Sequence, residues 1–169
     1  DMECGEGFDR ASLSLLGRQQ ELLESLQKTG KPLIVVYIEG RPLEKNWASE
    51  YADALLTAYY PGQEGGNAIA DVLFGDYNPS GRLPISVPRS VGQIPVYYNQ
   101  KAPRNHDYVE VSSSPLYSFG YGMSYTTFEY SDLQVVQKSA RCFEVSFKVK
   151  NTGKYDGEEV SQLYMRDEY

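Results

Sequence analysis

The 169-residue sequence has a single histidine, His106, and only two cysteines, Cys4 and Cys142. One imidazole excludes a metal centre with several histidine ligands, and it leaves a Ser/His/Asp triad with one possible base and no nucleophile elbow. The cysteines stand far apart and show no CxxC spacing, so no zinc site is expected. We expect free cysteines, with a disulfide as the alternative, and we expect no metal or other cofactor.

Basic residues never form a run interleaved with aromatic residues, and the net charge is −7 with a pI of about 4.8. These properties argue against a nucleic acid or an anionic membrane as a partner. No apolar stretch approaches the length of a membrane-spanning helix. The sequence does contain 41% hydrophobic and 23% charged residues, which is enough for a folded core. Its fifteen tyrosines suit sugar-binding surfaces, sandwich cores and interfaces alike.

The first half of the chain alternates helix and strand patterns. Ser12 or Ser14 can cap a helix that reaches about Thr29, with Gly30 ending it. Residues 33–38 form a continuous apolar run, which predicts a central parallel strand covered on both faces. A second strand is expected at 54–59, with helices at 43–51 and 67–74. The pattern predicts a parallel α/β layer fold, whose ligands would lie beyond the carboxyl ends of the strands.

The second half has a different character. Residues 92–116 show no clear period, which predicts a long irregular connection. Residues 143–149 alternate apolar and polar side chains, as expected of a half-buried antiparallel strand, and 159–165 predicts another strand. This region indicates the beginning of a β-sandwich with about three strands, where an immunoglobulin-like sandwich has about seven. We therefore expect the sequence to be a fragment of a longer protein.

Several motifs occur in one order along the chain, and together they resemble the C-terminal half of family 3 glycoside hydrolases, the β-glucosidase and β-xylosidase family. The motifs are Gly5-Glu6-Gly7-Phe8-Asp9-Arg10, Gly40-Arg41-Pro42-Leu43, residues 60–75, Asn78-Pro79-Ser80-Gly81-Arg82-Leu83-Pro84, Gln93-Ile94-Pro95, residues 116–125, Asn151-Thr152-Gly153 and residues 156–160. No single motif is decisive, but the ordered set is highly specific.

The resemblance implies a domain layout. Residues 1–91 would be part of an α/β/α sandwich domain, 92–117 an irregular connection, and 118–169 the start of a fibronectin-III-like β-sandwich. An N-terminal (β/α)8 barrel, absent from this sequence, would precede them and supply an Asp nucleophile.

The segment from Gly5 to Arg10 is the candidate catalytic site. The family places its general acid/base where Glu6 falls, with Glu3 as the fallback because this loop varies in length. Local pattern alone favours a helix-entry loop, whose acids favour the positive end of the helix dipole, and the catalytic role comes from the resemblance. Asp9, Arg10 and Arg41 are candidate substrate-binding residues. Their structural alternatives are an Asp9–Arg10 ion pair that shapes the loop and a loop anchor at Arg41.

The implied function is part of a retaining, exo-acting β-glycosidase, with β-glucosidase ranked first and β-xylosidase second. Its substrate would be an oligosaccharide or glycoside, its partner the barrel of the same protein, and its location the periplasm or the cell exterior. This chain alone would be inactive. The alternatives are a non-catalytic carbohydrate-binding or interaction module and an α/β scaffold protein without a sugar ligand.

Overall fold

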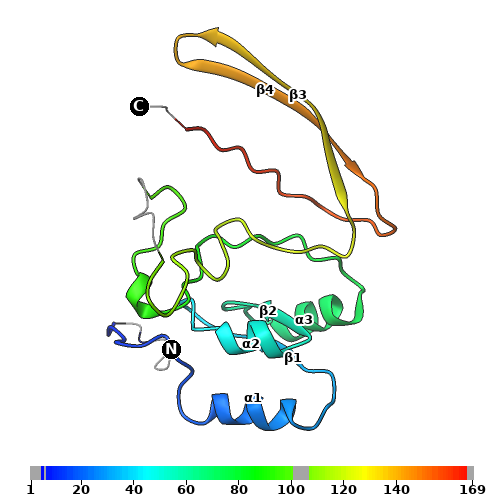
Figure 1. Cartoon of the computed structure of the whole chain (residues 1–169). Coiled ribbons are helices and arrows are strands. Elements are labelled where there is room, and N and C mark those ends of the chain that lie inside the picture. The colour runs from blue at the N-terminus through cyan, green and yellow to red at the C-terminus, as the bar shows by residue number, and fades with distance from the viewer. Residues whose placement is uncertain (1–4, 6, 101–106, 167–169) are drawn as a thin grey trace. The chain divides into compact units, whose positions relative to one another are not determined.

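The computed structural model describes residue 5 and residues 7–100 and 107–166 (Figure 1). The chain divides into two compact units. One contains residues 1–70 and 83–121, and the other contains residues 71–82 and 122–169. Helix α3 (Gly65–Phe74) runs from the first unit into the second. No helix of the described residues is long and apolar enough to cross a membrane.

The first unit is built on a small parallel sheet. Strand β1 (Ile34–Tyr37) pairs in parallel with β2 (Ala54–Thr57), in a register that runs from Ile34 opposite Ala54 to Tyr37 opposite Thr57. This confirms the predicted parallel pairing. Both strands are shorter than expected at their carboxyl ends, and Tyr59, beyond β2, has a φ of 49° that no strand residue adopts.

One face of this sheet is covered. Val35 and Tyr37 alternate onto the same face, where they are 8% and 6% exposed, and they form a buried cluster with Ala48 of α2 (Asn46–Tyr51). Helix α1 (Gln19–Gln27) adds Leu23 to the edge of this cluster. Ile34 is 49% exposed, so the prediction that the strand is covered on both faces is wrong for the described residues.

Helix α1 begins at Gln19, several residues later than the sequence predicts. The Ser12 hydroxyl accepts a hydrogen bond from the Ser14 backbone amide at 3.0 Å and pairs with the Ser14 hydroxyl at 2.7 Å. Such local bonds compete with helix formation. Gly17 then has a φ of +61°, which interrupts the helix direction. The two serines therefore form a local turn and do not cap the helix.

The connection after α3 has little regular structure. It contains a 3-10 helix at Val91–Gln93 and an isolated antiparallel bridge between Val87 and Tyr117. Gln93 is buried and fixes the neighbouring backbone: its amide nitrogen donates to the carbonyl oxygens of Ser112 and Ser114, and its oxygen accepts from the Arg89 amide.

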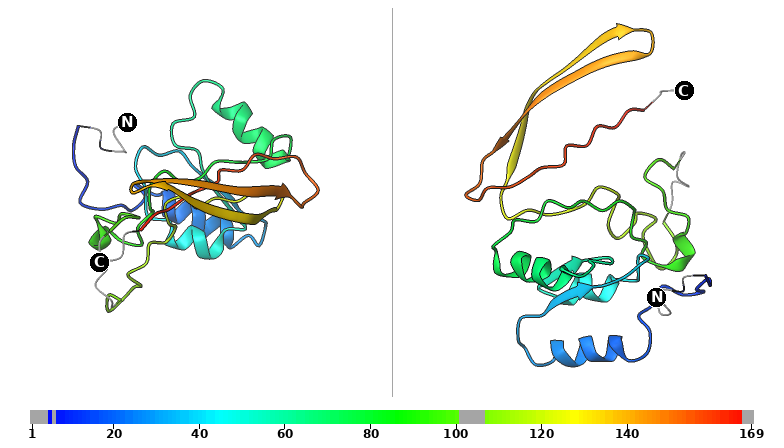
Figure 2. Two further views of the ribbon diagram at one scale, coloured as in Figure 1. Left: turned by 90° about the horizontal axis from the view of Figure 1, so that it is seen from above. Right: turned by 180° about the vertical axis from the view of Figure 1, so that it is seen from behind.

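The second unit holds an antiparallel hairpin of β3 (Phe128–Ser139) and β4 (Cys142–Asn151), drawn in yellow and orange in Figure 2. The predicted strand at 143–149 is thus confirmed, and Cys142 is a free, exposed cysteine. The register shifts between Ser131 and Gln134, where Asp132 has a φ of 54°. Among the described residues β3 and β4 pair only with each other.

Two expectations for this unit are wrong. The first is that the apolar face of the strand at 143–149 is buried. No second sheet covers the hairpin in the described part of the chain, so Phe143, Phe147 and Val149 are 46%, 38% and 40% exposed. Residues 159–165 form no strand, since they have no backbone ladder with the hairpin. Only side chains connect the two: the Tyr130 hydroxyl lies 3.1 Å from both Glu159 Oε1 and Ser161 Oγ.

Candidate functional site

The candidate site lies where β1 ends. The chain leaves β1 into a loop of residues 39–45 that carries the Gly40-Arg41-Pro42 motif, and it enters α2 at Asn46. Glu39 and Lys45 lie at the two ends of this loop, and each is 1% exposed. Lys45 Nζ lies 2.5 Å from Glu39 Oε1 and 2.7 Å from Oε2. The loop is therefore closed by a buried ion pair.

The surroundings of this ion pair satisfy both partners. The Glu39 carboxylate also accepts hydrogen bonds from the Leu43 amide at 3.0 Å and the Thr57 hydroxyl at 3.3 Å. Lys45 donates to the Leu43 carbonyl at 3.2 Å and lies 4.5 Å from the centre of the Tyr37 ring. A buried charge persists only with such partners.

The burial of this region changes the acidity of its side chains. Burial lowers the pKa of Lys45, while the hydrogen bond and the charge of Glu39 oppose that change. Burial, followed by the nearby Glu39 carboxylate, raises the pKa of Tyr37 to about 12. The same two causes raise the pKa of Tyr59. Each tyrosine therefore stays neutral to a higher pH than a tyrosine in water.

The segment after Gly5 makes a tight turn. The Phe8 amide donates to the Gly5 carbonyl at 2.9 Å, and the Arg10 guanidinium donates to the Ser14 carbonyl at 2.7 Å. Gly5 has a φ of +72°, and a Cβ there would lie 2.9 Å from the Phe8 carbonyl oxygen and 3.0 Å from the Arg10 Cγ. Both the left-handed backbone and the close approach require glycine at position 5.

Arg41 joins the 39–45 loop to this segment. Its Nη2 donates to the Gly5 carbonyl at 3.3 Å. A second connection lies nearby, where the Glu44 amide donates to the carbonyl of buried Leu13 at 2.8 Å. Arg10 and Arg41 thus both lie next to Gly5.

The remaining sequence candidates are placed differently. Asp9 is exposed, and the described residues contain no Asp9–Arg10 ion pair, because Arg10 turns towards the Ser14 carbonyl. Glu6, Glu3, Cys4 and His106 lie outside the described residues.

Gly40 is a point of close contact within the site. A Cβ on Gly40 would lie 2.3 Å from the hydroxyl oxygen of Tyr60, which follows β2. The loops after β1 and β2 therefore touch at the carboxyl ends of the two strands, as a parallel sheet requires.

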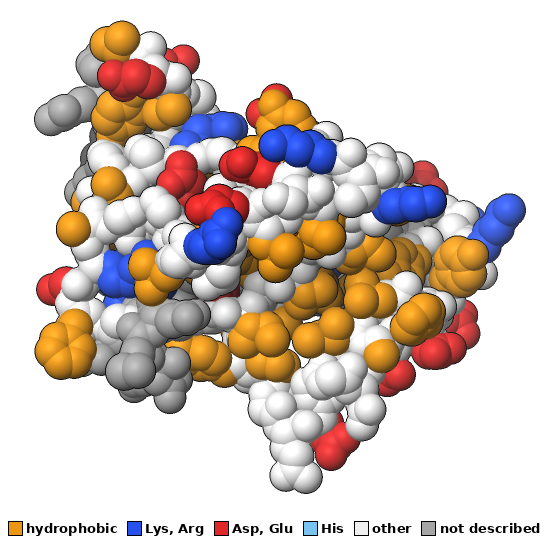
Figure 3. Space-filling model, turned by 90° about the horizontal axis from the view of Figure 1, so that it is seen from below, with side chains coloured by type: hydrophobic (Ala, Val, Ile, Leu, Met, Phe, Trp, Pro, Cys, Tyr) orange, Lys and Arg blue, Asp and Glu red, His pale blue; other side chains and the backbone are white. Residues whose placement is uncertain are grey.

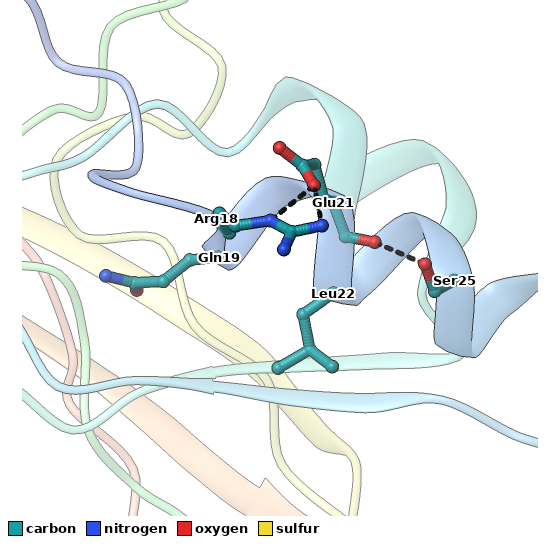
Figure 4. A pocket seen from close by; sticks show the side chains of 5 residues that line it. All are labelled: Arg18, Gln19, Glu21, Leu22 and Ser25. Carbon is teal, nitrogen blue, oxygen red and sulfur yellow. Dashed lines mark hydrogen bonds and ion pairs between the residues drawn. The ribbon is translucent and has the colours of Figure 1, made fainter.

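A hollow on the surface of α1 does not involve this site. Figure 4 shows two interactions there: Arg18 pairs with the Glu21 side chain at 2.7 Å, and the Ser25 hydroxyl donates to the Glu21 backbone carbonyl at 2.7 Å. None of the residues expected to act on a ligand lines it.

Sequence reasoning missed the roles of Glu39 and Lys45. A carboxylate placed directly after an apolar strand, with a lysine six residues later across a Gly-Arg-Pro turn, was the available signal. Charged residues are almost never fully buried without a partner, so the pair could have been sought there.

Comparison with known proteins identifies the family. Residues 1–125 match the model of the glycosyl hydrolase family 3 C-terminal domain. A β-xylosidase of Formosa agariphila is 46% identical over 98% of this chain and 24% of its own length. A periplasmic β-glucosidase of Salmonella typhimurium is 46% identical over 96% of this chain and 23% of its own length. The chain thus spans about a quarter of these relatives.

Solved structures agree with this assignment. A β-glucosidase from Erythrobacter marinus matches 86% of this chain and 20% of its own, with a TM-score of 0.78 and 47% identity. A β-glucosidase from Listeria innocua in complex with glucose matches 89% of this chain and 28% of its own, with a TM-score of 0.71 and 30% identity. The chain therefore belongs to glycosyl hydrolase family 3, and residues 1–125 correspond to the C-terminal domain of that family.

Proposed function

We propose that this chain supplies the general acid/base to a retaining, exo-acting β-glycosidase that removes terminal β-linked sugars from an oligosaccharide or glycoside. β-Glucosidase is the first candidate activity and β-xylosidase the second. The observation that carries the proposal is the family match over residues 1–125, joined to relatives that are named as these two enzymes.

The proposed catalytic residue is Glu6. The nucleophile is an Asp in an N-terminal (β/α)8 barrel of the same protein. In the first step the Asp carboxylate bonds to the anomeric carbon as the glycosidic bond breaks, and the Glu6 carboxyl gives its proton to the leaving oxygen. In the second step the Glu6 carboxylate takes a proton from water, the water oxygen bonds to the anomeric carbon, and the Asp is released. In this mechanism the two carboxyls stand about 5–5.5 Å apart.

The surface of the chain supports a larger assembly. Large apolar side chains are exposed on α1, on α3 and on the hairpin, and Figure 3 shows apolar side chains spread over one face. They include Leu22 (58% exposed), Phe74 (84%) and Leu133 (68%). Proteins that act alone rarely expose so much apolar surface, so further parts of the protein are the natural cover.

The domain layout belongs to the same proposal. Residues 1–91 form part of an α/β/α sandwich domain, 92–117 connect it onwards, and 118–169 begin a fibronectin-III-like domain to which the β3–β4 hairpin contributes. Asp9, Arg10 and Arg41 line or shape the sugar site. The protein acts in the periplasm or outside the cell, which agrees with the name of the Salmonella relative.

Leaving-group selectivity tests the role of Glu6. In the full-length protein, Glu6→Ala should lower turnover of plain disaccharides about 10²–10⁴-fold, because these need a proton donor. It should largely spare kcat/KM for 2,4-dinitrophenyl glycosides, because that ratio reports the first step and their leaving group departs without a proton. Glu21→Ala, an exposed glutamate on α1, is the matched control and should change neither rate. Equal losses for both substrates with Glu6→Ala would refute the assignment. Sugar binding without turnover by the wild-type protein would favour a non-catalytic binding module.

A further inference from the structure

The buried Glu39–Lys45 pair has a consequence for the neighbouring segment. The pair closes the 39–45 loop at both ends, and its extra hydrogen bonds to the Leu43 amide and carbonyl fix the middle of the loop. The Asn46 side chain adds a hydrogen bond to the Arg89 carbonyl at 2.6 Å, which secures the start of α2. The loop is thereby held in one conformation from Glu39 to Asn46.

This fixed loop holds the segment that carries Glu6 at two points. Arg41 donates to the carbonyl of Gly5, the residue directly before Glu6, and the Glu44 amide donates to the Leu13 carbonyl. The Gly5 carbonyl also accepts from the Phe8 amide, so a single oxygen joins Phe8 and the loop. The Arg41 bond is charge-assisted but long, at 3.3 Å, and the backbone bond from Glu44 is 2.8 Å.

We infer that Glu39 and Lys45 form a positioning pair, which acts through Arg41 on the Gly5 carbonyl to hold the acid/base segment in place. This inference rests on the proposed function. Arg41 is then a positioning residue and not a sugar ligand. General acid catalysis depends on hydrogen-bond geometry at the leaving oxygen, so a loosened segment should impair proton transfer more than sugar binding.

The test uses the full-length protein with Arg41→Met as the main variant. Misplacing a catalytic group by about 1 Å can cost about 100-fold, so kcat for a plain disaccharide should fall about 10- to 100-fold. KM for the disaccharide should stay within about 3-fold. For a 2,4-dinitrophenyl glycoside kcat/KM should also stay within about 3-fold, because that ratio reports the first step and this leaving group needs no proton donor. Arg18→Met is the matched control: this exposed arginine directly precedes α1, and its loss should change the kinetics of neither substrate.

A second pair of variants probes the buried partners. The double variant Glu39→Gln/Lys45→Met leaves no buried unpaired charge and should show the same selective loss as Arg41→Met. If Arg41→Met raises KM for both substrates and leaves kcat unchanged, Arg41 binds sugar and the inference is overturned. Equal losses of kcat/KM for the two substrates in these variants, beside a selective loss of kcat/KM in Glu6→Ala, would overturn the inference and leave the proposed function intact.

If Glu6→Ala impairs both substrates equally, hydrogen exchange still tests the positioning role of Arg41 separately from the acid/base role of Glu6. Arg41 anchors the Gly5 carbonyl that accepts from the Phe8 amide, so Arg41→Met should loosen this segment and speed exchange at Phe8 at least 10-fold, while Arg18→Met does not. Unchanged exchange at Phe8 would overturn the positioning role whatever the outcome for Glu6.

Discussion

Lys45 Nζ lies 2.5 Å from Glu39 Oε1, with each side chain only 1% exposed, at the carboxyl end of the strand that forms the centre of the first unit. Each of these buried charges is stabilised by the opposite charge of its partner. Removing one would leave the other without compensation in a place that water cannot reach.

We therefore expect Lys45→Met to lower the free energy of unfolding by about 3–5 kcal/mol, because the Glu39 carboxylate is left buried and unpaired. Glu39→Gln/Lys45→Met should cost distinctly less, since glutamine is neutral and keeps an oxygen for the Leu43 amide. Urea unfolding of both variants measures the difference. A double variant as unstable as the single one would contradict this account.

The raised pKa of Tyr37 implies that the protein loses stability at alkaline pH. Its pKa is about 12 in the folded protein against the ordinary value of 10.0, so the unfolded chain ionises first. Its contribution to stability is complete below pH 10 and falls as the pH rises towards about 12. Between pH 9 and pH 11 the loss should be about 1 kcal/mol. Tyr37→Phe should remove that part of the pH dependence, as measured by urea unfolding at both pH values. An identical alkaline slope in the variant would exclude Tyr37 as its source.

A side chain at position 40 would collide with Tyr60. A Cβ at this position would lie 2.3 Å from the Tyr60 hydroxyl oxygen and 2.6 Å from its Cζ, so Gly40→Ala should cost about 1–3 kcal/mol. Adding Tyr60→Ala should relieve most of the cost of Gly40→Ala in a double-mutant cycle by thermal unfolding. Gly66→Ala, with open space around its Cβ in α3, is the control and should be neutral or stabilising by up to about 1 kcal/mol. Strictly additive effects at positions 40 and 60 would argue against the conflict.

The Asn78 side chain is expected to contribute strongly to the stability of the second unit. Its oxygen accepts from the Tyr125 amide at 2.8 Å and the Ser124 hydroxyl at 3.0 Å, and its nitrogen donates to the Asp156 carbonyl at 2.9 Å. With about 1 kcal/mol for each hydrogen bond, Asn78→Ala should destabilise this unit by about 2–3 kcal/mol. Hydrogen exchange at the Tyr125 amide should rise in parallel. Asn67→Ala removes one exposed bond to Glu64 and should cost less than about 1 kcal/mol. Similar losses for both would show that the Asn78 bonds contribute little.

The sequence predicted those parts of the fold that depend on local patterns. The apolar run before Glu39 has few alternatives to a buried strand, and the next strand returns in parallel because a helix lies between them. The alternation at residues 143–149 likewise required a strand. Predictions of where elements begin and end were less successful, because the Ser12–Ser14 turn and the φ of Gly17 decide the start of α1 and leave no mark on periodicity.

The contacts within the candidate site could not be predicted from the sequence. The resemblance pointed to the Gly5 segment and Arg41, and the structure brings these together through one carbonyl oxygen. The buried partner of Glu39 depends on the path of a proline-containing loop, which no spacing rule describes. Burial of the hairpin depends on what packs against it, and that information is not contained in the alternation of the strand itself.

The hairpin also bears on how this protein is handled at the bench. Both outer edges of the β3–β4 ladder lack a neighbouring strand among the described residues, and apolar side chains such as Leu133 and Val135 are 68% and 59% exposed. Open edges of this kind recruit strands from other copies. A recombinant protein made of these 169 residues should therefore self-associate through the hairpin at high concentration.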